Sequence, residues 1–443
     1  MFGYSMIELV RTHADKMDQP LREQILNLFK PLKYTPFVFH NSIEDIIRRG
    51  KKLPVIVEFE KNLYVKGCEE LKGTIQNCPN SKVRQDFPRI SCSSVDLTPN
   101  TLEELLTTCH GIKRIHSNSE VRALLDVAVQ SANAKNVVRN NTVLTGKGVK
   151  IAIIDTGIYP HEDLKGRITD FVDFVNGRTD PYDDNGHGTH CAGAAAGNGA
   201  ASSRKYRGPA PEADLVGVKV LNSIGSGSLE SIMQGVEWCI QYNEQNPTDK
   251  IDILSMSLGA TAQAYSNENR DPMVQMVEAA WQAGIVVCAA SGNEGPESQT
   301  IASPGISDQV ITVGALDDRN TSSTKSDDVI AGFSSRGPTI YGVVKPDIVS
   351  PGVNIVSLRS PNSYLDKFQR ASRVGQAYFT LSGTSMATPI CAGVVALMKQ
   401  QNPSLQPPEI KKLLKNGADF WKGRDQNIYG VGYINAEKSI PKR

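Results

Sequence analysis

One serine hydroxyl stands out in the run Leu381–Pro389, where Ser385 lies between Gly383 and a stretch of small apolar residues typical of a buried helix. A serine hydroxyl is a poor nucleophile near neutral pH and needs a base to take its proton. His187 can fill that role because neutral imidazole titrates close to the working pH. Asp155, at the end of an apolar run, can hold the imidazole in the correct tautomer. The three side chains predict acyl transfer through a nucleophilic serine, provided that the fold brings them together.

A further motif supplies donors for the negative charge that such a reaction develops. Residues 286–290 read as a buried strand, and a turn that contains Asn293 follows them. The side-chain amide of Asn293 and the backbone N–H of Ser385, at a helix N-terminus, are donors of the kind that stabilise an oxyanion. We therefore expect Asn293 to be the oxyanion donor.

The elements around these residues alternate between strand and helix. Apolar runs typical of parallel strands covered on both faces occur at 149–154, 214–220, 251–256, 285–290 and 310–313. Helical patterns occur at 188–196, 229–244, 273–283, 384–400 and 408–416. This alternation predicts an α/β fold with a doubly wound, mostly parallel sheet. Such a sheet can place strand ends and helix starts, and so Asp155, His187 and Ser385, along one edge.

Five short motifs, in order along the chain, resemble those of the subtilase (subtilisin-like) family of serine proteases. They are Asp155-Thr156-Gly157, Gly186-His187-Gly188-Thr189-His190, Ser257-Leu258-Gly259, Gly292-Asn293 and Gly383-Thr384-Ser385-Met386-Ala387. The resemblance covers roughly Gly146 to Glu437, and the whole chain is most similar to the AprX-type intracellular serine proteases of bacilli. It implies a serine endopeptidase that works through an acyl-enzyme, with broad specificity for extended polypeptides.

The resemblance also implies where a substrate binds. Gly225, Ser226 and Gly227 on one side, and Ser257, Leu258 and Gly259 on the other, resemble the two segments that sandwich an extended peptide through main-chain hydrogen bonds. For Gly225 and Gly227, a simple turn is the alternative. The small residues that would line the pocket for the residue before the cut bond predict a preference for large apolar side chains; they are Gly259, Ala289, Ala290 and the stretch near Ala302. Glu294, at the rim of this pocket, either favours substrates with Lys or Arg before the cut bond or is simply solvated by water.

Three domains are expected: a helical extension at 1–52, a small α+β domain at 53–126 and a peptidase domain at 127–443. The order of elements expected in the second domain is β-α-β-α-β. This domain resembles the subtilase propeptide, which acts as an intramolecular chaperone and inhibitor. We expect residues 117–127 to occupy the substrate groove and to be cut there. A permanent accessory domain is the alternative.

Composition narrows the class of protein. A net charge of +1 and the absence of a basic, aromatic-rich stretch argue against nucleic acid as a partner. No run approaches the length needed to span a bilayer, and the first 30 residues lack the apolar core of a secretory signal. The eight cysteines lie mostly in apolar patterns and are expected to be buried thiols. These features predict a cytoplasmic protein.

No cofactor or metal is expected to be required. Asp163 matches a calcium ligand of the family, but the rest of that ligand set is missing, so a calcium requirement is not supported. His190 is interpreted as structural, and Cys191 and Cys391 as packing residues. The stretches 260–271 and 360–378 are longer than the family pattern, and each is either a gate over the cleft or a surface loop.

Two other function classes compete with a peptidase. A catalytically silent binding protein on the same fold is disfavoured because Asp155, His187, Asn293 and Ser385 are all present. An esterase or lipase is disfavoured because no G-x-S-x-G motif surrounds Ser385 and the order Asp, His, Ser differs from that of α/β-hydrolases.

Overall fold

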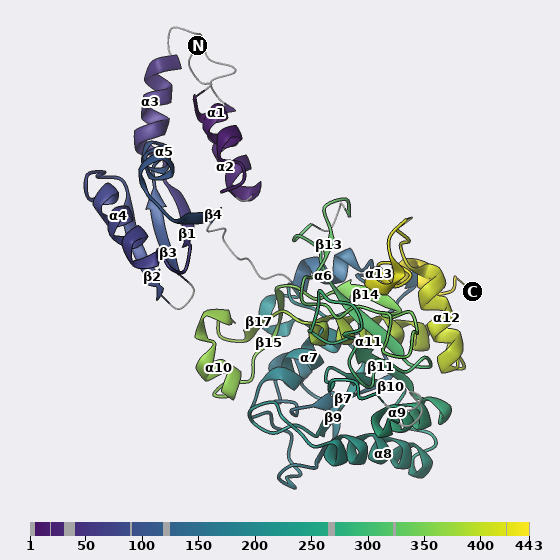
Figure 1. Ribbon diagram of the computed structural model, residues 1–443. Helices are drawn as coiled ribbons and strands as arrows, with labels where there is room; N and C mark the ends of the chain where they lie inside the picture. The colour runs from purple at the N-terminus through teal and green to yellow at the C-terminus, as the bar shows by residue number, and fades with distance from the viewer. Residues whose placement is uncertain are drawn as a thin grey trace. The chain divides into compact units, whose positions relative to one another are not determined.

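The computed structural model describes residues 5–17, 19–30, 40–88, 91–117, 125–264, 271–321, 325–421 and 423–442. The chain divides into two compact units, Met1–Val121 and Arg122–Arg443, each with its own apolar core (Figure 1). Among the residues just given, no helix combines the length and apolarity needed to cross a membrane.

The first unit contains a four-stranded antiparallel sheet in the order β2-β3-β1-β4. Its elements are β1 Leu53–Phe59, α4 Tyr64–Gln76, β2 Lys82–Phe87, β3 Cys92–Leu97, α5 Pro99–Thr108 and β4 Ile112–Ser117. The sequence pattern predicted all of these except β2. This edge strand carries Lys82, Arg84 and Asp86, so it lacks the apolar run by which a buried strand is recognised.

Three helices of the N-terminal extension belong to the same unit: α1 Ser5–Thr12, α2 Gln19–Phe29 and α3 His40–Gly50. Leu21 and Ile25 of α2 lie in one apolar cluster with Val55 and Val57 of β1. The backbone of the segment after α1 also reaches the sheet, because the N–H of Ile115 donates to the carbonyl of Lys16 at 2.7 Å. The extension and the small sheet therefore share one core. The boundaries predicted at residues 52 and 126 stay predictions, and residues 118–124 of the segment expected in the groove lie outside the described residues.

The second unit is built on an eight-stranded sheet, in which seven strands follow the order β13-β12-β11-β10-β7-β9-β8 and β14 pairs with β12. The strands are β7 Lys150–Asp155, β8 Ile168–Asp173, β9 Asp214–Lys219, β10 Ile253–Met256, β11 Val286–Ala290, β12 Ile311–Asp317, β13 Val329–Ile330 and β14 Ile348–Pro351. Every pairing is parallel except that of β12 with β13.

Two pairs of helices cover this sheet. Helices α7 (His187–Ala196) and α11 (Thr384–Gln401) contact each other and the central strands, as do α8 (Leu229–Gln245) and α9 (Pro272–Gln282). Figure 1 shows the two pairs on opposite sides of β7 and β10. The predicted α/β fold with a doubly wound, mostly parallel sheet is thus confirmed.

The other elements of this unit are short or lie near its C-terminus. They are α6 Leu125–Ser131, β5 Val138–Arg139, β6 Thr142–Val143, the 3-10 helices Glu162–Leu164, Ala200–Ser202 and Arg370–Ser372, β15 Ile355–Leu358, α10 Tyr364–Phe368, β16 Arg373–Val374, β17 Tyr378–Leu381, α12 Pro407–Gly417, α13 Gln426–Tyr429 and α14 Ala436–Ser439. A small sheet in the order β15-β17-β16 carries the chain from the main sheet to the start of α11.

Candidate active site

Asp155 ends β7 near the centre of the large sheet, between β9 and β10, and its side chain is fully buried. Its carboxylate accepts hydrogen bonds from the backbone N–H of Thr156, at 2.7 Å, and from the Nδ1–H of His187, at 2.8 Å to Oδ1 and 2.9 Å to Oδ2. Buried carboxylates need such donors. The imidazole is therefore held with Nδ1 toward Asp155 and Nε2 left for chemistry.

His187 is the first residue of α7, where the chain turns sharply. Gly186 has a φ of 105°, a left-handed conformation that favours glycine. A Cβ on Gly188 would lie 2.2 Å from the carbonyl oxygen of Gly157 and 3.2 Å from Oδ1 of Asp155. The glycines around His187 thus let the start of α7 approach the end of β7.

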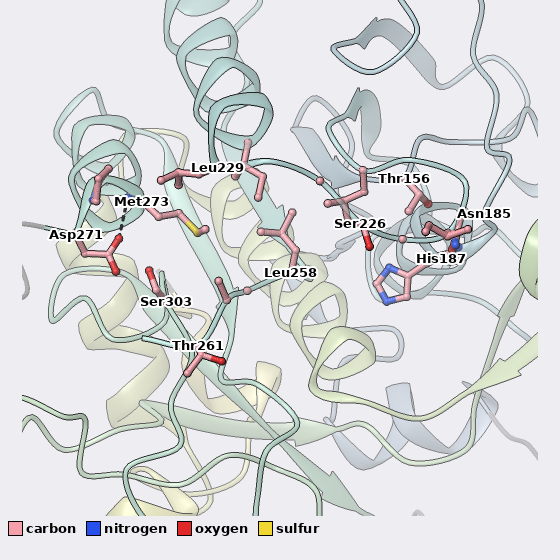
Figure 2. Close-up of a pocket in the computed structure, with 18 of the residues that line it drawn as sticks. Thr156, Asn185, His187, Ser226, Leu229, Leu258, Thr261, Asp271, Met273 and Ser303 are labelled. Atoms are coloured by element: carbon pink, nitrogen blue, oxygen red, sulfur yellow. Dashed lines mark hydrogen bonds between the residues drawn. The ribbon is translucent and has the colours of Figure 1, made fainter. Parts of the chain in front are cut away.

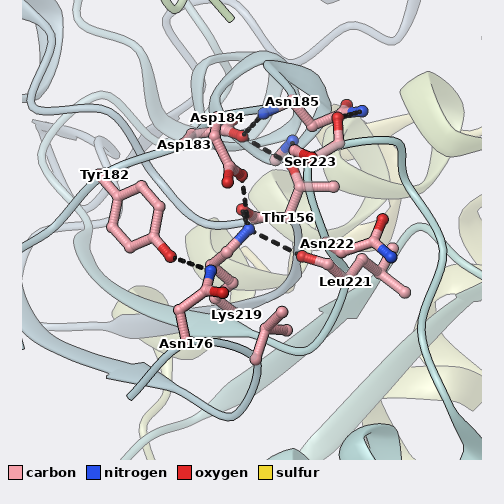
Figure 3. Close-up of polar contacts among 12 residues, drawn as sticks. Thr156, Asn176, Tyr182, Asp183, Asp184, Asn185, Lys219, Leu221, Asn222 and Ser223 are labelled. Carbon is pink, nitrogen blue, oxygen red and sulfur yellow. Dashed lines mark hydrogen bonds and ion pairs between the residues drawn. The ribbon is translucent and has the colours of Figure 1, made fainter. Parts of the chain in front are cut away.

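A network of polar side chains holds the start of α7 close to the end of β7 (Figure 3). The ammonium of Lys219, fully buried, donates to the carbonyls of Thr156 and Leu221 and to Asp184, at 2.7, 2.8 and 2.7 Å. Asp183 accepts from the hydroxyls of Thr156, at 2.9 Å, and Thr189, at 2.6 Å. The network joins the segment after Asp155 to the loop before His187. Asp183 and Asp184 therefore hold the segment that follows Asp155 close to the loop that precedes His187.

Ser385 is the second residue of α11, and a proline four residues later decides its backbone contacts. Pro389 lacks an N–H, so the carbonyl of Ser385 loses its ordinary helical partner. That carbonyl accepts instead from the hydroxyl of Ser257, at 2.7 Å, and from the thiol of Cys191, at 3.4 Å. The start of α11 is thereby tied to Ser257, the residue after β10, and to Cys191 of α7.

The hydroxyl of Ser385 donates to the carbonyl of Ser257 at 3.1 Å. No hydrogen bond joins Ser385 to His187 within the described part of the chain. Cys191 lies close to both residues, because its sulfur is 3.9 Å from Nδ1 of His187 and 3.4 Å from the carbonyl of Ser385. Hydrogen bonds between groups of an active site are often long or poorly aligned in structures without substrate.

Electrostatics favour a charged imidazole at this position. Burial is the largest single effect and opposes the charged ring, but the charge and hydrogen bonds of Asp155, with Cys191 beside them, together raise the pKa of His187 well above its ordinary value. A base of raised pKa takes a proton from a serine hydroxyl more readily. The same carboxylate would stabilise the imidazolium that this transfer creates.

Asn293 follows β11 and is anchored through one end of its side chain. Its Oδ1 accepts from the backbone N–H of Thr384, at 2.9 Å, and from the hydroxyl of Thr384, at 3.0 Å. Because Thr384 precedes Ser385, the amide Nδ2 is fixed beside the start of α11. Asn293 and Ser385 line one cavity.

Two adjoining cavities, of about 620 and 550 Å³, share a wall formed by Leu258, Gly259, Ala260 and Thr261. The larger contains His187, Gly225, Ser226 and Gly227, and Figure 2 shows the His187 ring facing it. The smaller contains Asn293, Glu294, Ala290, Ala302 and Ser385. Ala289 and Ser257 were predicted to line the substrate site, but both are buried. Ala289 lies within β11, and the hydroxyl of Ser257 donates to the carbonyl of Ser385.

Several residues of the larger cavity were not predicted from the sequence, including Asn185, Leu221, Ile224 and Leu365. Leu365 belongs to α10, within the long stretch 360–378, and its N–H donates to the carbonyl of Asn185 at 2.9 Å. Asp366, nearly buried, accepts from Arg359 and Arg373, which ties this stretch down. The unusual length of 360–378 was the one signal in the sequence that could have found Leu365.

One group of metal-ligating side chains lies at the site itself. Within the described residues, Asp155, His187 and Cys191 offer ligand atoms within 4.8 Å of one another. A metal ion there would displace the hydrogen bonds between His187 and Asp155. His190 has a different environment, because its Nε2 lies 3.0 and 3.1 Å from the carbonyls of Ile355 and Phe379. Burial lowers the pKa of His190 to about 3, so it serves as a neutral structural residue.

Asp163, the one match to a family calcium ligand, is satisfied by the protein. Its buried carboxylate accepts from the N–H groups of Gly199 and Ala201, at 3.1 and 2.9 Å, and from the hydroxyl of Tyr378, at 2.8 Å. A calcium ion would have to displace these donors, because it needs the same lone pairs. The residues at this position therefore do not fit calcium.

The fold and this arrangement define a subtilisin-like serine endopeptidase, and comparison with known proteins agrees. Residues 146–432 match the subtilase family, and the chain belongs to that family. Among solved structures, Sphericase is 29% identical with a TM-score of 0.57, covering 71% of this chain and 99% of that protein.

Named relatives make the assignment more specific. The chain is 60% identical over 441 residues to Serine protease AprX of Bacillus subtilis (strain 168), with 100% of both chains covered. It is 39% identical to Subtilisin Savinase of Lederbergia lenta, over 67% of this chain and 93% of that protein. The chain is thus a serine protease similar to AprX over its whole length.

Proposed function

We propose that the protein cuts polypeptides through an acyl-enzyme, with Ser385 as nucleophile, His187 as general base and acid, Asp155 as the carboxylate that orients His187, and Asn293 as oxyanion donor. The observation that carries this proposal is the pair of hydrogen bonds from His187 to the fully buried Asp155. Family membership supports the same roles.

The reaction requires one rotation of the nucleophile. The Ser385 hydroxyl leaves the Ser257 carbonyl and turns toward Nε2 of His187, which takes its proton as Oγ bonds to the scissile carbonyl carbon. The carbonyl oxygen becomes an oxyanion, which accepts from Nδ2 of Asn293 and the N–H of Ser385. When the intermediate collapses, the C–N bond breaks and His187 gives the proton to the leaving amine. Water then hydrolyses the acyl-enzyme by the same steps and restores the serine.

Removing the amide of Asn293 tests the oxyanion role. We expect Asn293→Ala to lower kcat by about 10²–10³-fold, because the donor acts on charge that develops only in the transition state. KM should change little for the same reason. Steady-state kinetics on one peptide amide measure both constants. A large rise in KM with an unchanged kcat would assign Asn293 to substrate binding instead.

The proposed substrate is an extended polypeptide with a large apolar residue before the cut bond. The cavity beside Ser385 has small walls at Gly259, Ala290 and Ala302, which leave room for a large side chain. A Cβ on Gly259 would approach the Ala302 Cβ to 3.1 Å, so glycine keeps the two walls apart. Gly225, Ser226 and Gly227 on one strip, with Leu258 and Gly259 on the other, are proposed to pair with the substrate backbone.

A peptide series that varies only the residue before the cut bond tests this specificity. We expect kcat/KM to be about 100-fold higher for Phe or Leu than for Asp, because a carboxylate would be desolvated against apolar walls. Comparing Lys with Phe in the same series measures what Glu294 contributes at the rim. A preference for acidic residues would refute the proposed pocket.

The first unit is proposed to act as a propeptide, that is, as chaperone and inhibitor of the second. Its position directly before the peptidase unit and its compact antiparallel sheet support this role. We expect active wild-type enzyme to have lost its N-terminal unit and a Ser385→Ala variant to keep it. Mass measurement of both purified proteins decides the matter. Fully active enzyme that retains Met1 would favour a permanent accessory domain.

The protein is proposed to act in the cytoplasm. All eight cysteines lie in the described residues, none is in a disulfide, and seven of them are buried. Cysteine-containing proteins that rely on no disulfide are typical of reducing compartments. Cell fractionation with an antibody against the chain tests this; recovery only from the culture medium would contradict it.

A further inference from the structure

The stretch 360–378, which is longer than the family pattern, is held beside the cleft through one carboxylate. Asp366, 2% exposed, lies in α10 and accepts from the guanidinium groups of Arg359, at 2.5 Å, and Arg373, at 2.7 Å. It also accepts from the backbone N–H of Asn362 at 2.9 Å. Charge-assisted hydrogen bonds are stronger than neutral ones, and two of them meet here on a buried carboxylate. Helix α10 is therefore a fixed part of the peptidase unit.

Helix α10 packs directly on the turn that precedes His187. The backbone N–H of Leu365 donates to the carbonyl of Asn185 at 2.9 Å. A Cβ added to Gly186 would lie 3.7 Å from the Cβ of Leu365, which is van der Waals contact. His187 follows Gly186 in the chain and begins α7. Leu365 therefore lies against the backbone that carries the proposed general base.

Asn185 connects α10 to one of the two strips proposed to pair with the substrate. Its carbonyl accepts from the N–H of Leu365, whereas its side-chain Nδ2 donates to the carbonyl of Ser223 at 3.0 Å. The same Nδ2 lies 3.5 Å from the place of a Cβ on Gly225, where the strip of residues 225–227 begins. Leu365, Asn185 and Gly225 all line the larger cavity. A continuous wall of that cavity therefore runs from α10 to the strip.

An extended substrate turns successive side chains to opposite sides of its backbone. With the residue before the cut bond in the smaller cavity, beside Ser385, the residue that precedes it points the other way, toward the larger cavity and the ring of His187 (Figure 2). Leu221 and Leu365 both line that cavity. Leu221 lies beside the proposed orienting carboxylate, because its N–H donates to the carbonyl of Asp155 at 3.2 Å. Two apolar side chains are thus available at the His187 end of the larger cavity.

We propose that Leu365, with Leu221, binds the side chain of the second residue before the cut bond and makes the peptidase select an apolar residue there. This inference rests on the proposed function, since it concerns the same cleft. Burial of apolar surface against the two leucines favours an aliphatic side chain, whereas a charged side chain would lose its solvent there. Main-chain pairing with the strips accepts many sequences, so the stretch 360–378 adds a selectivity that the strips lack.

Peptide amides with Phe before the cut bond, and Leu, Gly or Lys before that Phe, test the role of Leu365. For the wild-type protein we expect kcat/KM to be about 10-fold higher with Leu than with Gly or Lys. Leu365→Glu should reverse the order and favour Lys over Leu by about 10-fold, because a carboxylate then faces the ammonium. The matched control Phe368→Glu places the same charge on α10 at a side chain that is 72% exposed and lines neither cavity. It should keep the preference for Leu.

Leu365→Ala covers the case in which Leu365→Glu fails to fold. It removes only the contact, so the ratio of kcat/KM for Leu over Gly should fall to within about twofold of one. Turnover of the Gly peptide shows that each variant is folded. A wild-type protein that cuts none of the peptides would refute the peptidase function itself. Normal cleavage with unchanged ratios in both Leu365 variants would overturn the role of Leu365 alone, as would an equal reversal in Phe368→Glu, which would indicate charge acting at a distance.

Discussion

Ser385→Ala is expected to reduce peptide hydrolysis by about 10⁶-fold, which is the loss typical of a serine peptidase without its nucleophile. The proposed acyl-enzyme forms on this hydroxyl, because the hydroxyl of neighbouring Thr384 is hydrogen-bonded to Asn293. The fold should survive, since the exchange removes only the hydrogen bond to the Ser257 carbonyl.

The matched control is Ser382→Ala, a change at an exposed residue three positions earlier, whose hydroxyl accepts a hydrogen bond from the backbone N–H of Asn354 at 2.8 Å. We expect it to keep activity within a few-fold of wild type. Release of product from a peptide amide, followed over days for the Ser385→Ala protein, measures the difference. Equal activity in the two variants would remove Ser385 from the mechanism.

Asp155→Asn is expected to lower kcat by about 10⁴-fold at neutral pH. In the wild-type protein both carboxylate oxygens of Asp155 accept from the Nδ1–H of His187. The neutral amide has one oxygen and presents an N–H in place of the other, so it cannot hold Nδ1 protonated through two acceptors. The backbone N–H of Thr156 donates to Oδ1 of Asp155, so the substituted side chain must also keep an oxygen at that position. The exposed Asp180 offers a control, because Asp180→Asn should leave kcat unchanged.

The pH profile separates this electrostatic role from simple support of the fold. Asp155 raises the pKa of His187. Without the carboxylate that pKa falls, so His187 stays neutral to lower pH and the acid limb of kcat/KM moves to lower pH. The residual activity of Asp155→Asn should therefore persist under more acidic conditions than wild type. An acid limb at an unchanged pH would contradict the proposed role of Asp155.

Much of the peptidase unit follows from local patterns in the sequence. Strands β7, β9, β10 and β11 are mostly apolar between their ends because both of their faces are covered, and each is predicted within two residues. The starts of α7 and α11 are equally clear, because glycines and small residues mark where those helices approach the sheet. The chemistry of Asp155, His187, Ser385 and Asn293 follows from their residue types, their order and the family resemblance.

Other features depend on contacts that no local pattern encodes. Strand β2 is polar because it lies at a sheet edge, and the contact of Leu365 with the cleft depends on how the stretch 360–378 folds back. The bond from Ser257 to the Ser385 carbonyl exists because Pro389 frees that carbonyl.

Labelling by an organophosphonate that reacts only with an activated serine is the most direct test of the central claim, that Asp155 and His187 activate Ser385. Peptide mapping by mass spectrometry should locate a single adduct on Ser385 in the wild-type protein and none in His187→Ala. An adduct on another serine, or equal labelling of Ser385 when His187 is absent, would contradict the account.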